Sequence, residues 1–416
     1  MIATLRDPKE LRRKLRNWSR DPNMVVYGVL LVGAILFPPL ASFATGTNTL
    51  TSLAADAGVW VLLAIGLNVV VGFAGLLDLG YAAFFAIGAY TYALLASTQL
   101  AASPIHTAVH LPFWILLFIA MFVAATAGAL LGAPTLRLRG DYLAIVTLGF
   151  GEIVPRVFRN DPGHFTGGIN AIGNIDQPTL PICLDGPWSR GDDLKLMFGT
   201  SNCSFSITDP TAYYVLMVLL IIACVILVSN LQVSRLGRAW AAVREDEVAA
   251  AAMGVNTRNI KLIAFAIGAA FSGFGGAYYG AKLSLVSPDN FDFTVSITVL
   301  VMVVLGGMGN IAGVIIGALA VYFLEFKFLT DLPRNTHALV DAIGLGPLLD
   351  PSNPATGWPG IEDFVGRLNF LVLGLILVLM MLLRPQGILP SRVRAQELKS
   401  EGAQDDTVFD QRAGQT

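Results

Sequence analysis

TAYYVLMVLLIIACVILVS, residues 211–229, decides the fold class, because it carries no charge over the length of a membrane-crossing helix. Nine further apolar stretches are candidate transmembrane or re-entrant helices: 24–43, 56–73, 76–98, 111–131, 141–158, 259–282, 293–306, 310–328 and 367–383. The whole chain is 55% apolar and 13% charged, roughly half the charged share of a soluble domain. We therefore expect an all-α polytopic membrane protein with about ten such helices in a lipid bilayer.

Two regions leave the membrane topology open. Segments 56–73 and 76–98 run together through Gly72 and Gly75, and 293–306 ends in the run Gly306-Gly307-Met308-Gly309. Broken helices are tolerated at membrane depth only where protein or a water-filled cavity covers the backbone. Whether 56–98 and 293–328 cross fully or re-enter is therefore undecided from the sequence.

The distribution of Lys and Arg predicts that both termini lie on the inner side of the membrane. With ten crossings, the inner segments 1–23, 132–140, 230–258 and 384–416 hold most of the 27 Lys and Arg residues. The long outer segments 159–210 and 329–366 are acidic instead. The positive-inside rule then gives an N-in, C-in orientation.

These segments divide the chain into a basic N-terminus (1–23), a membrane domain (24–390) and a tail. The tail, 391–416, is polar and aperiodic, and we expect it to be disordered. Cys183 and Cys203 both lie in the outer loop 159–210. They either form a disulfide in an oxidising compartment or remain two free thiols. Cys224 lies in an apolar span and is expected to be a small core residue.

Two acidic residues fall at membrane depth, Asp78 in GLLDLGY (75–81) and Glu152 in GFGEIVP (149–155). An intramembrane carboxylate is a candidate for a transport path, and the adjacent glycines suggest unwound backbone. The structural alternative for Asp78 is a hydrogen bond to a neighbouring helix. For Glu152, an i,i+4 ion pair with Arg156 is favoured over a transport role.

Aromatic residues follow Asp78 at helical spacing. Tyr81, Phe84 and Phe85 share a face with it. They either line an apolar path or form a core or lipid-facing stripe, which is the commoner role of such patterns.

The inner loop 230–258 is the strongest feature outside the membrane. Strong helix formers predict one helix from Arg238 to Met253, ended by Gly254. Its charged residues are expected to face the cytoplasm: Arg238, Arg244, Glu245, Asp246 and Glu247. Such a helix is suited to docking into a groove of a partner, and a solvated connecting helix is the alternative.

Motifs of enzymes and nucleic-acid-binding proteins are missing from the sequence. There is no Gly-Lys dipeptide, and hence no Walker A phosphate loop, nor a His-Glu-x-x-His or Gly-x-Ser-x-Gly motif. No basic stretch interleaved with aromatic residues suggests a nucleic-acid partner. We expect no catalytic residues, no metal site and no cofactor bound by this chain.

Four ordered stretches resemble a known family. They are GLLDLGYAAFFAIGAY (75–90), LRLRGDYLAIVTLGFGEIVP (136–155) with FTGGIN (165–170), the region 244–280, and 296–317 with RPQG (384–387). Together they resemble the LivM-type permease subunits of the bacterial branched-chain amino acid ABC importer family.

The resemblance implies a multi-pass protein of the bacterial inner membrane that forms half of a translocation pore with a second, homologous permease. Two cytoplasmic ATPase subunits would bind ATP-Mg, and a periplasmic substrate-binding protein would deliver leucine, isoleucine or valine. The loop 230–258 would couple the pore to the ATPases, although Glu247 lies seven residues before Gly254 rather than the family's usual six.

The resemblance also adds Thr166, Gly167, Gly168 and Asn170 to the candidate transport path, with Ala171 where the family commonly has glycine. A permease for urea or short amides in the same family is an alternative. A stand-alone secondary carrier, with carboxylates that couple transport to an ion, is another. A membrane enzyme is weaker, because no catalytic constellation is present.

Overall fold

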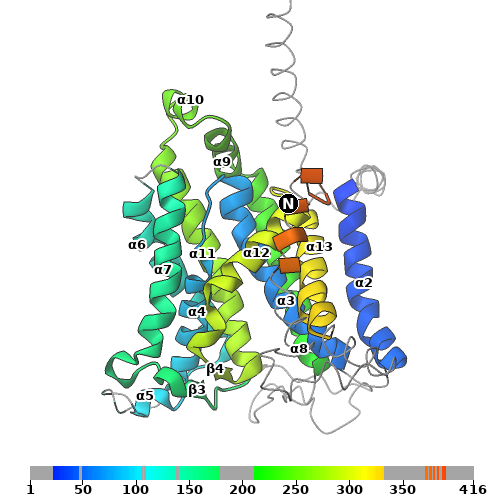
Figure 1. Ribbon diagram of the computed structural model, residues 1–416, viewed down its shortest axis with the longest axis vertical. Helices are drawn as coiled ribbons and strands as arrows, with labels where there is room; N and C mark the ends of the chain where they lie inside the picture. The colour runs from blue at the N-terminus through cyan, green and yellow to red at the C-terminus, as the bar shows by residue number, and fades with distance from the viewer. Residues whose placement is uncertain are drawn as a thin grey trace, which may run out of the picture.

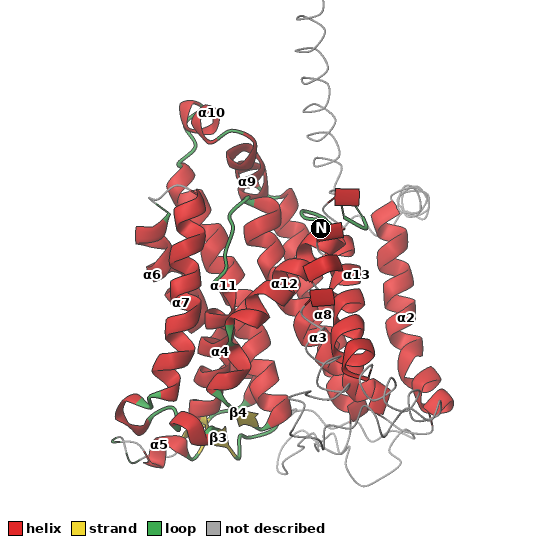
Figure 2. Ribbon diagram, viewed as in Figure 1, coloured by secondary structure: helices red, strands yellow, loops and turns green. Residues whose placement is uncertain are grey.

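The computed structural model describes residues 22–45, 49–102, 104, 106, 109–136, 140–178, 210–331 and scattered positions between 371 and 389. Within them the chain is a bundle of helices (Figures 1 and 2). Cys183 and Cys203, whose state the sequence leaves open, lie outside the described residues. So do the basic N-terminus up to residue 21, most of the loop 329–366 and the tail 391–416.

The longer elements are α-helices that follow one another along the bundle. They are α2 (Pro22–Thr45), α3 (Thr49–Leu67), α4 (Tyr81–Leu95), α6 (Phe113–Thr135), α7 (Gly140–Arg159), α8 (Pro210–Val233), α11 (Thr257–Leu283), α12 (Phe293–Gly306) and α13 (Ile311–Tyr322). Short helices connect them: α5 (Gln99–Ala102), α9 (Arg235–Glu245) and α10 (Glu247–Ala252).

Tighter and wider helical turns and short strands complete the described chain. The 3₁₀ turns are η3 (Pro162–His164), η4 (Gly168–Asn170) and η5 (Pro288–Phe291), and the π-helical turns are η2 (Asn68–Phe73) and η6 (Phe323–Leu329). Strand β1 (Ala96–Ser97) pairs antiparallel with β2 (Val109–His110), with Ala96 opposite His110. Strand β3 (Ile172–Gly173) pairs antiparallel with β4 (Leu285–Val286), with Ile172 opposite Val286.

Six helices in the described residues are long and apolar enough to cross a membrane. They are Thr49–Phe73, Phe113–Thr135, Pro210–Val233, Thr257–Leu283, Pro288–Gly306 and Ile311–Leu329. Val26–Leu40 and Tyr81–Leu95 are apolar but shorter. The chain is therefore a multi-pass helical membrane protein, as the sequence predicts.

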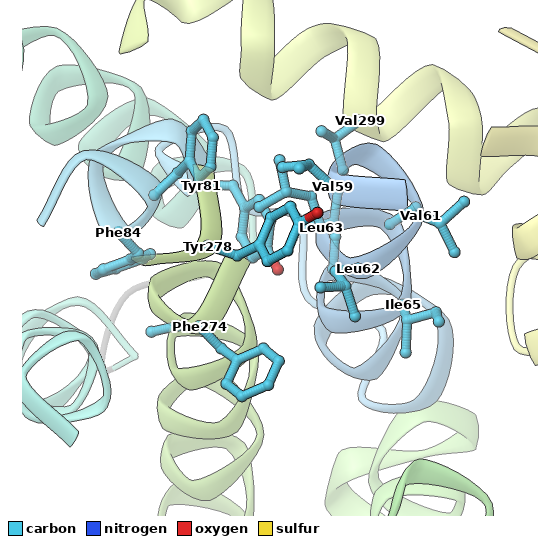
Figure 3. Close-up of a cluster of buried hydrophobic side chains, with 14 of the residues drawn as sticks. Val59, Val61, Leu62, Leu63, Ile65, Tyr81, Phe84, Phe274, Tyr278 and Val299 are labelled. Carbon is cyan, nitrogen blue, oxygen red and sulfur yellow. The ribbon is translucent and has the colours of Figure 1, made fainter. Parts of the chain in front are cut away.

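Helix α11 lies at the centre and packs against α6, α4 and α3. A Cβ added at Gly276 would collide with the carbonyl oxygen of Phe85, and one added at Gly88 with the backbone of Gly273. The backbones of α4 and α11 are therefore almost in contact, which only small residues permit. Around this contact, side chains of α3, α4, α11 and α12 form a continuous apolar core (Figure 3).

The segment 56–98 is interrupted, as the glycines suggest. Helix α3 widens into η2, residues 74–80 are non-helical, and α4 begins only at Tyr81, five residues later than the predicted span 76–98. A second interruption separates α12 from α13, where Gly307 (φ 113°) and Gly309 (φ 83°) adopt backbone conformations that favour glycine. The amides of Ile388 and Leu389 bond to the carbonyls of Leu305 and Gly306 and so tie the last described residues to the end of α12.

The two ends of the bundle differ. Helices α9 and α10 project from one end, whereas α5, β3 and β4 lie at the opposite end (Figure 1). We call them the α9–α10 end and the β3–β4 end.

Candidate functional site

The 230–258 loop forms two helices rather than the predicted single helix. The break falls at Asp246, which has extended backbone angles (φ −153°, ψ 109°). Its Oδ1 accepts hydrogen bonds from the amides of Val248 (2.8 Å) and Ala249 (3.0 Å) and so caps α10. An aspartate competes well for this capping position, which outweighs the helix propensity of its neighbours. Gly254 ends the pair with φ 86°, as predicted.

Helix α9 is anchored to the bundle. Trp240 is fully buried, and its Nε1 donates a hydrogen bond to the carbonyl of Ile260 in α11 at 2.8 Å. Val243 is buried on the same face. Because this ring fills the space between α9 and α11, motion of α9 relative to the bundle must displace it.

Helix α10, in contrast, presents apolar side chains to the outside. Val248 is 80% exposed and Met253 is 85% exposed. Glu247 is half-exposed and pairs with Lys261, with 2.5 Å between Oε2 and Nζ. Exposed apolar residues at the tip of a short capped helix are suited to a partner's groove.

Arg244 links α9 to the break after α3. Its guanidinium donates a hydrogen bond to the carbonyl of Gly72 in η2. Gly75 has φ 70°, and a Cβ there would lie 2.9 Å from Cγ of Arg244. The arginine therefore crosses closely over backbone that only glycine accommodates without strain.

Asp78 lies in that break and is 1% exposed. Its Oδ1 accepts a hydrogen bond from the amide of Gly80 at 2.9 Å. Thr147 of α7 accepts one from the amide of Leu79 at 3.1 Å, and Ser296 of α12 accepts one from the amide of Ala82 at 2.9 Å. Side chains thus satisfy the amides at the start of α4, so Asp78 has a structural partner, while its place in a transport path stays a prediction.

The aromatic residues that follow Asp78 lie in the interior. Tyr81 is fully buried and donates a hydrogen bond to the carbonyl of Gly268 at 3.3 Å. The ring of Phe84 lies 5.6 Å from that of Phe265, centroid to centroid. Tyr81 and Phe84 belong to the cluster in Figure 3, which fits the core alternative.

Glu152 lines a hollow nearer the β3–β4 end, and Asp78 is not among the residues that line it. Its Oε2 lies 2.9 Å from Nη2 of Arg156, which confirms the predicted i,i+4 pair. The hollow has a volume of about 400 Å³ and lies between α7 and the segment 288–292. Arg159 of α7 forms an ion pair with Asp289 across it. The sequence gives no signal that Arg159, Asp289 and Asp292 meet here, because 130 residues separate the first two.

The loop Thr166–Asn170 follows α7 at the same end. The amide of Thr166 donates a hydrogen bond to Oδ1 of Asp161 at 2.8 Å, and its hydroxyl to the carbonyl of Phe158 at 2.6 Å. Burial raises the pKa of Asp161, but hydrogen bonds from Thr166 and His164 outweigh it, so this pKa lies below its usual value. Gly167 (φ 68°) and Gly168 (φ 55°) form the turn, and Asn170 is exposed.

Ala171 has φ 61°, a conformation that explains why glycine is expected there. In the part of the chain that the structure describes, no group of three or more His, Cys, Asp or Glu side chains is arranged to hold a metal ion.

The membrane helices, the capped helix pair and the charged hollow together define a multi-pass membrane protein of the transporter class. Residues 49–343 match a single protein family, and the chain belongs to this family, described as branched-chain amino acid transport system / permease component.

Two relatives show the likeness along most of the chain. It is 39% identical over 381 residues to the high-affinity branched-chain amino acid transport system permease protein LivM of Escherichia coli (strain K12), covering 90% of this chain and 76% of that protein. It is 27% identical over 271 residues to the permease protein LivH of the same organism, covering 64% and 80%. No solved structure matches the chain significantly.

Proposed function

We propose that this chain is a permease subunit of an ATP-driven importer for leucine, isoleucine and valine in the bacterial inner membrane. The LivM relatives, 39% identical over most of the chain, support the substrate class. The observation that carries the ATP-driven mechanism is the capped helix pair α9–α10 with its exposed apolar tip. Partner ATPases would bind this helix pair and transmit their motion through it to the membrane helices.

Related permeases of two types, LivM and LivH, support a pore made of two homologous subunits. In our proposal the second permease forms the other half of the pore. Two ATPase subunits bind ATP-Mg at the α9–α10 end, and a periplasmic binding protein delivers the amino acid at the β3–β4 end. This chain itself binds no cofactor.

The proposed topology has about ten transmembrane or re-entrant helices, with both termini in the cytoplasm. The concentration of Lys and Arg in 1–23, 132–140, 230–258 and 384–416 supports this orientation. It makes the α9–α10 end cytoplasmic and the β3–β4 end periplasmic.

Coupling runs through the contact between Arg244 and Gly72 in this proposal. An ATPase that moves α10 pulls on α9, which is held to η2 by Arg244 and to α11 by Trp240. The break at 74–80 lies directly after η2 and is held by Thr147 of α7. A displacement at α9 therefore reaches both the interrupted helix and the helix that carries Glu152.

The test is co-purification in mild detergent combined with uptake of radiolabelled leucine. The tagged chain should recover two Walker-A-bearing ATPases and a second permease, and uptake should persist when an uncoupler collapses the ion gradient while ATP stays high. Loss of leucine uptake when the uncoupler collapses the ion gradient would favour the secondary-carrier alternative. Competition by urea or short amides, but not by isoleucine or valine, would favour the alternative of a permease for urea or short amides.

The docking claim has its own variants. Val248→Asp and Met253→Asp place charges on the exposed tip without touching the core, and ATPase recovery should fall sharply. Ile169→Asp is the matched control, because Ile169 is 79% exposed at the opposite end of the bundle. Equal ATPase recovery from all three variants would refute docking through α10.

A further inference from the structure

The hollow between α7 and the segment 288–292 has an unusual lining for a membrane helix bundle. It contains two guanidinium groups, from Arg156 and Arg159, and three carboxylates, from Glu152, Asp289 and Asp292. Its volume of about 400 Å³ lies within the range of small-molecule sites, roughly 300–1,000 Å³.

This hollow extends along the last two turns of α7. Glu152 lies seven residues before Arg159, the last residue of α7, which corresponds to about 10 Å along the helix. The side chain of Glu152 is 41% exposed and that of Arg156 is 74% exposed. These two charged side chains are therefore accessible to a polar solute that enters the hollow.

The acidic wall of the hollow is held in place by the fold. Phe291, between Asp289 and Asp292, is fully buried and packs against Phe85 at 5.0 Å between ring centroids. Strand β4, just before this segment, pairs with β3. The two carboxylates therefore occupy defined positions opposite the arginines of α7.

The charges of the hollow match those of an α-amino acid. A carboxylate accepts hydrogen bonds from the fork of a guanidinium group, and an ammonium group donates them to carboxylates. The ion pair between Arg159 and Asp289 already places one group of each kind side by side. A zwitterion bound between them exchanges one ion pair for two and adds no net charge. The rings of Pro155 and Pro288 line the same hollow and offer apolar surface to a side chain.

We propose that this hollow binds the zwitterionic head of the transported α-amino acid. Arg159 receives the carboxylate, and Asp289 with Asp292 receives the ammonium group. This inference rests on the proposed import function and adds to it a binding site within this chain.

The probe for the test is a diazirine analogue of leucine, applied to the assembled importer in lipid nanodiscs. After irradiation, labelled peptides are mapped by mass spectrometry. Labels should fall on the C-terminal half of α7 and on residues 286–292. An excess of leucine should suppress them, whereas leucinamide, which lacks the carboxylate, and 4-methylvalerate, which lacks the ammonium group, should not.

Variants separate binding from structure. Arg159→Gln and Asp289→Asn should each lower labelling about tenfold or more, the effect of losing a charge-assisted hydrogen bond. The double variant Arg159→Asp with Asp289→Arg restores an ion pair of reversed polarity. It should keep the thermal stability of the wild type but not its labelling. Lys327→Gln, an exposed residue of η6, is the control and should label normally.

Leucine uptake is measured with the same importer reconstituted in proteoliposomes. It distinguishes failure of the proposed binding site from failure of the proposed import function. Uptake with labels that map elsewhere, or labelling restored by the reversed pair, would overturn the binding site alone. Labels in the hollow without uptake would support binding of leucine there but overturn the import function, and with it the claim that the bound amino acid is the one transported. The absence of both labelling in the hollow and leucine uptake would overturn the binding site and the import function together.

Discussion

Replacing Lys282 with methionine is expected to destabilise the bundle by about 3 kcal/mol. Lys282, near the end of α11, has its Nζ 2.6 Å from Oδ1 of Asp56 in α3. The same ammonium group donates a hydrogen bond to the carbonyl of Ser52 at 3.0 Å. These contacts join two core helices through residues far apart in the sequence.

The magnitude follows from the burial of the pair. Removing one member of a buried ion pair costs about 3–5 kcal/mol, because the other charge is left without its partner. The side chain of Lys282 is 9% exposed and that of Asp56 is 36% exposed. Solvent screens the remaining carboxylate in part, which favours the lower end of the range. Methionine keeps most of the apolar stem, so lost packing adds little.

The assay is unfolding of the purified protein by SDS in mixed micelles, followed by tryptophan fluorescence. Lys282→Met should unfold at lower SDS than the wild type, and adding Asp56→Asn should recover most of the loss, because no unpaired charge remains. Lys327→Met breaks an exposed pair with Asp331 and should cost less than about 1 kcal/mol. Two results would refute this reasoning. One is that Lys282→Met unfolds at the same SDS concentration as the wild type. The other is that the double variant loses as much stability as the two single variants added together.

Other perturbations test the remaining elements. Trp240→Phe removes the donor to the carbonyl of Ile260 and should cost about 1–3 kcal/mol, seen as faster hydrogen–deuterium exchange in α9; unchanged exchange would contradict the anchoring role. Gly276→Val would collide with the backbone of α4 and should abolish the monodisperse peak in size-exclusion chromatography. Gly149→Ala, where nothing lies within 4 Å of the added Cβ, should keep that peak. Asp246→Ala removes the cap of α10 and should destabilise that helix by about 1 kcal/mol, measurable as exchange of residues 247–252. Asp246→Asn should preserve protection there, and equal exchange in both variants would argue against capping.

The membrane class and several local features were predictable from the sequence. Apolar transfer energies add along a helix, so spans such as 211–229 are apparent without any tertiary information. The pair of Glu152 and Arg156 was predictable because i,i+4 neighbours meet on any helix. Gly254 was predictable as a helix end, because its backbone freedom is a property of the residue itself.

Other features depended on which helices pack together. The break at Asp246 reflects a competition between capping and propensity that the residue pattern left undecided. The contact of Arg244 with Gly72, the ion pair of Lys282 with Asp56 and the pair of Arg159 with Asp289 each join segments more than 100 residues apart.

The sequence by itself therefore determined that this chain is a helical multi-pass membrane protein and that the loop 230–258 is helical and charged. The tertiary structure alone decided that Asp78 is buried in the break before α4, whereas Glu152 lines a charged hollow with two acids from another segment. The physical reason is that hydrophobicity and i,i+4 contacts act along the chain, whereas burial and charge pairing depend on the packing of distant helices.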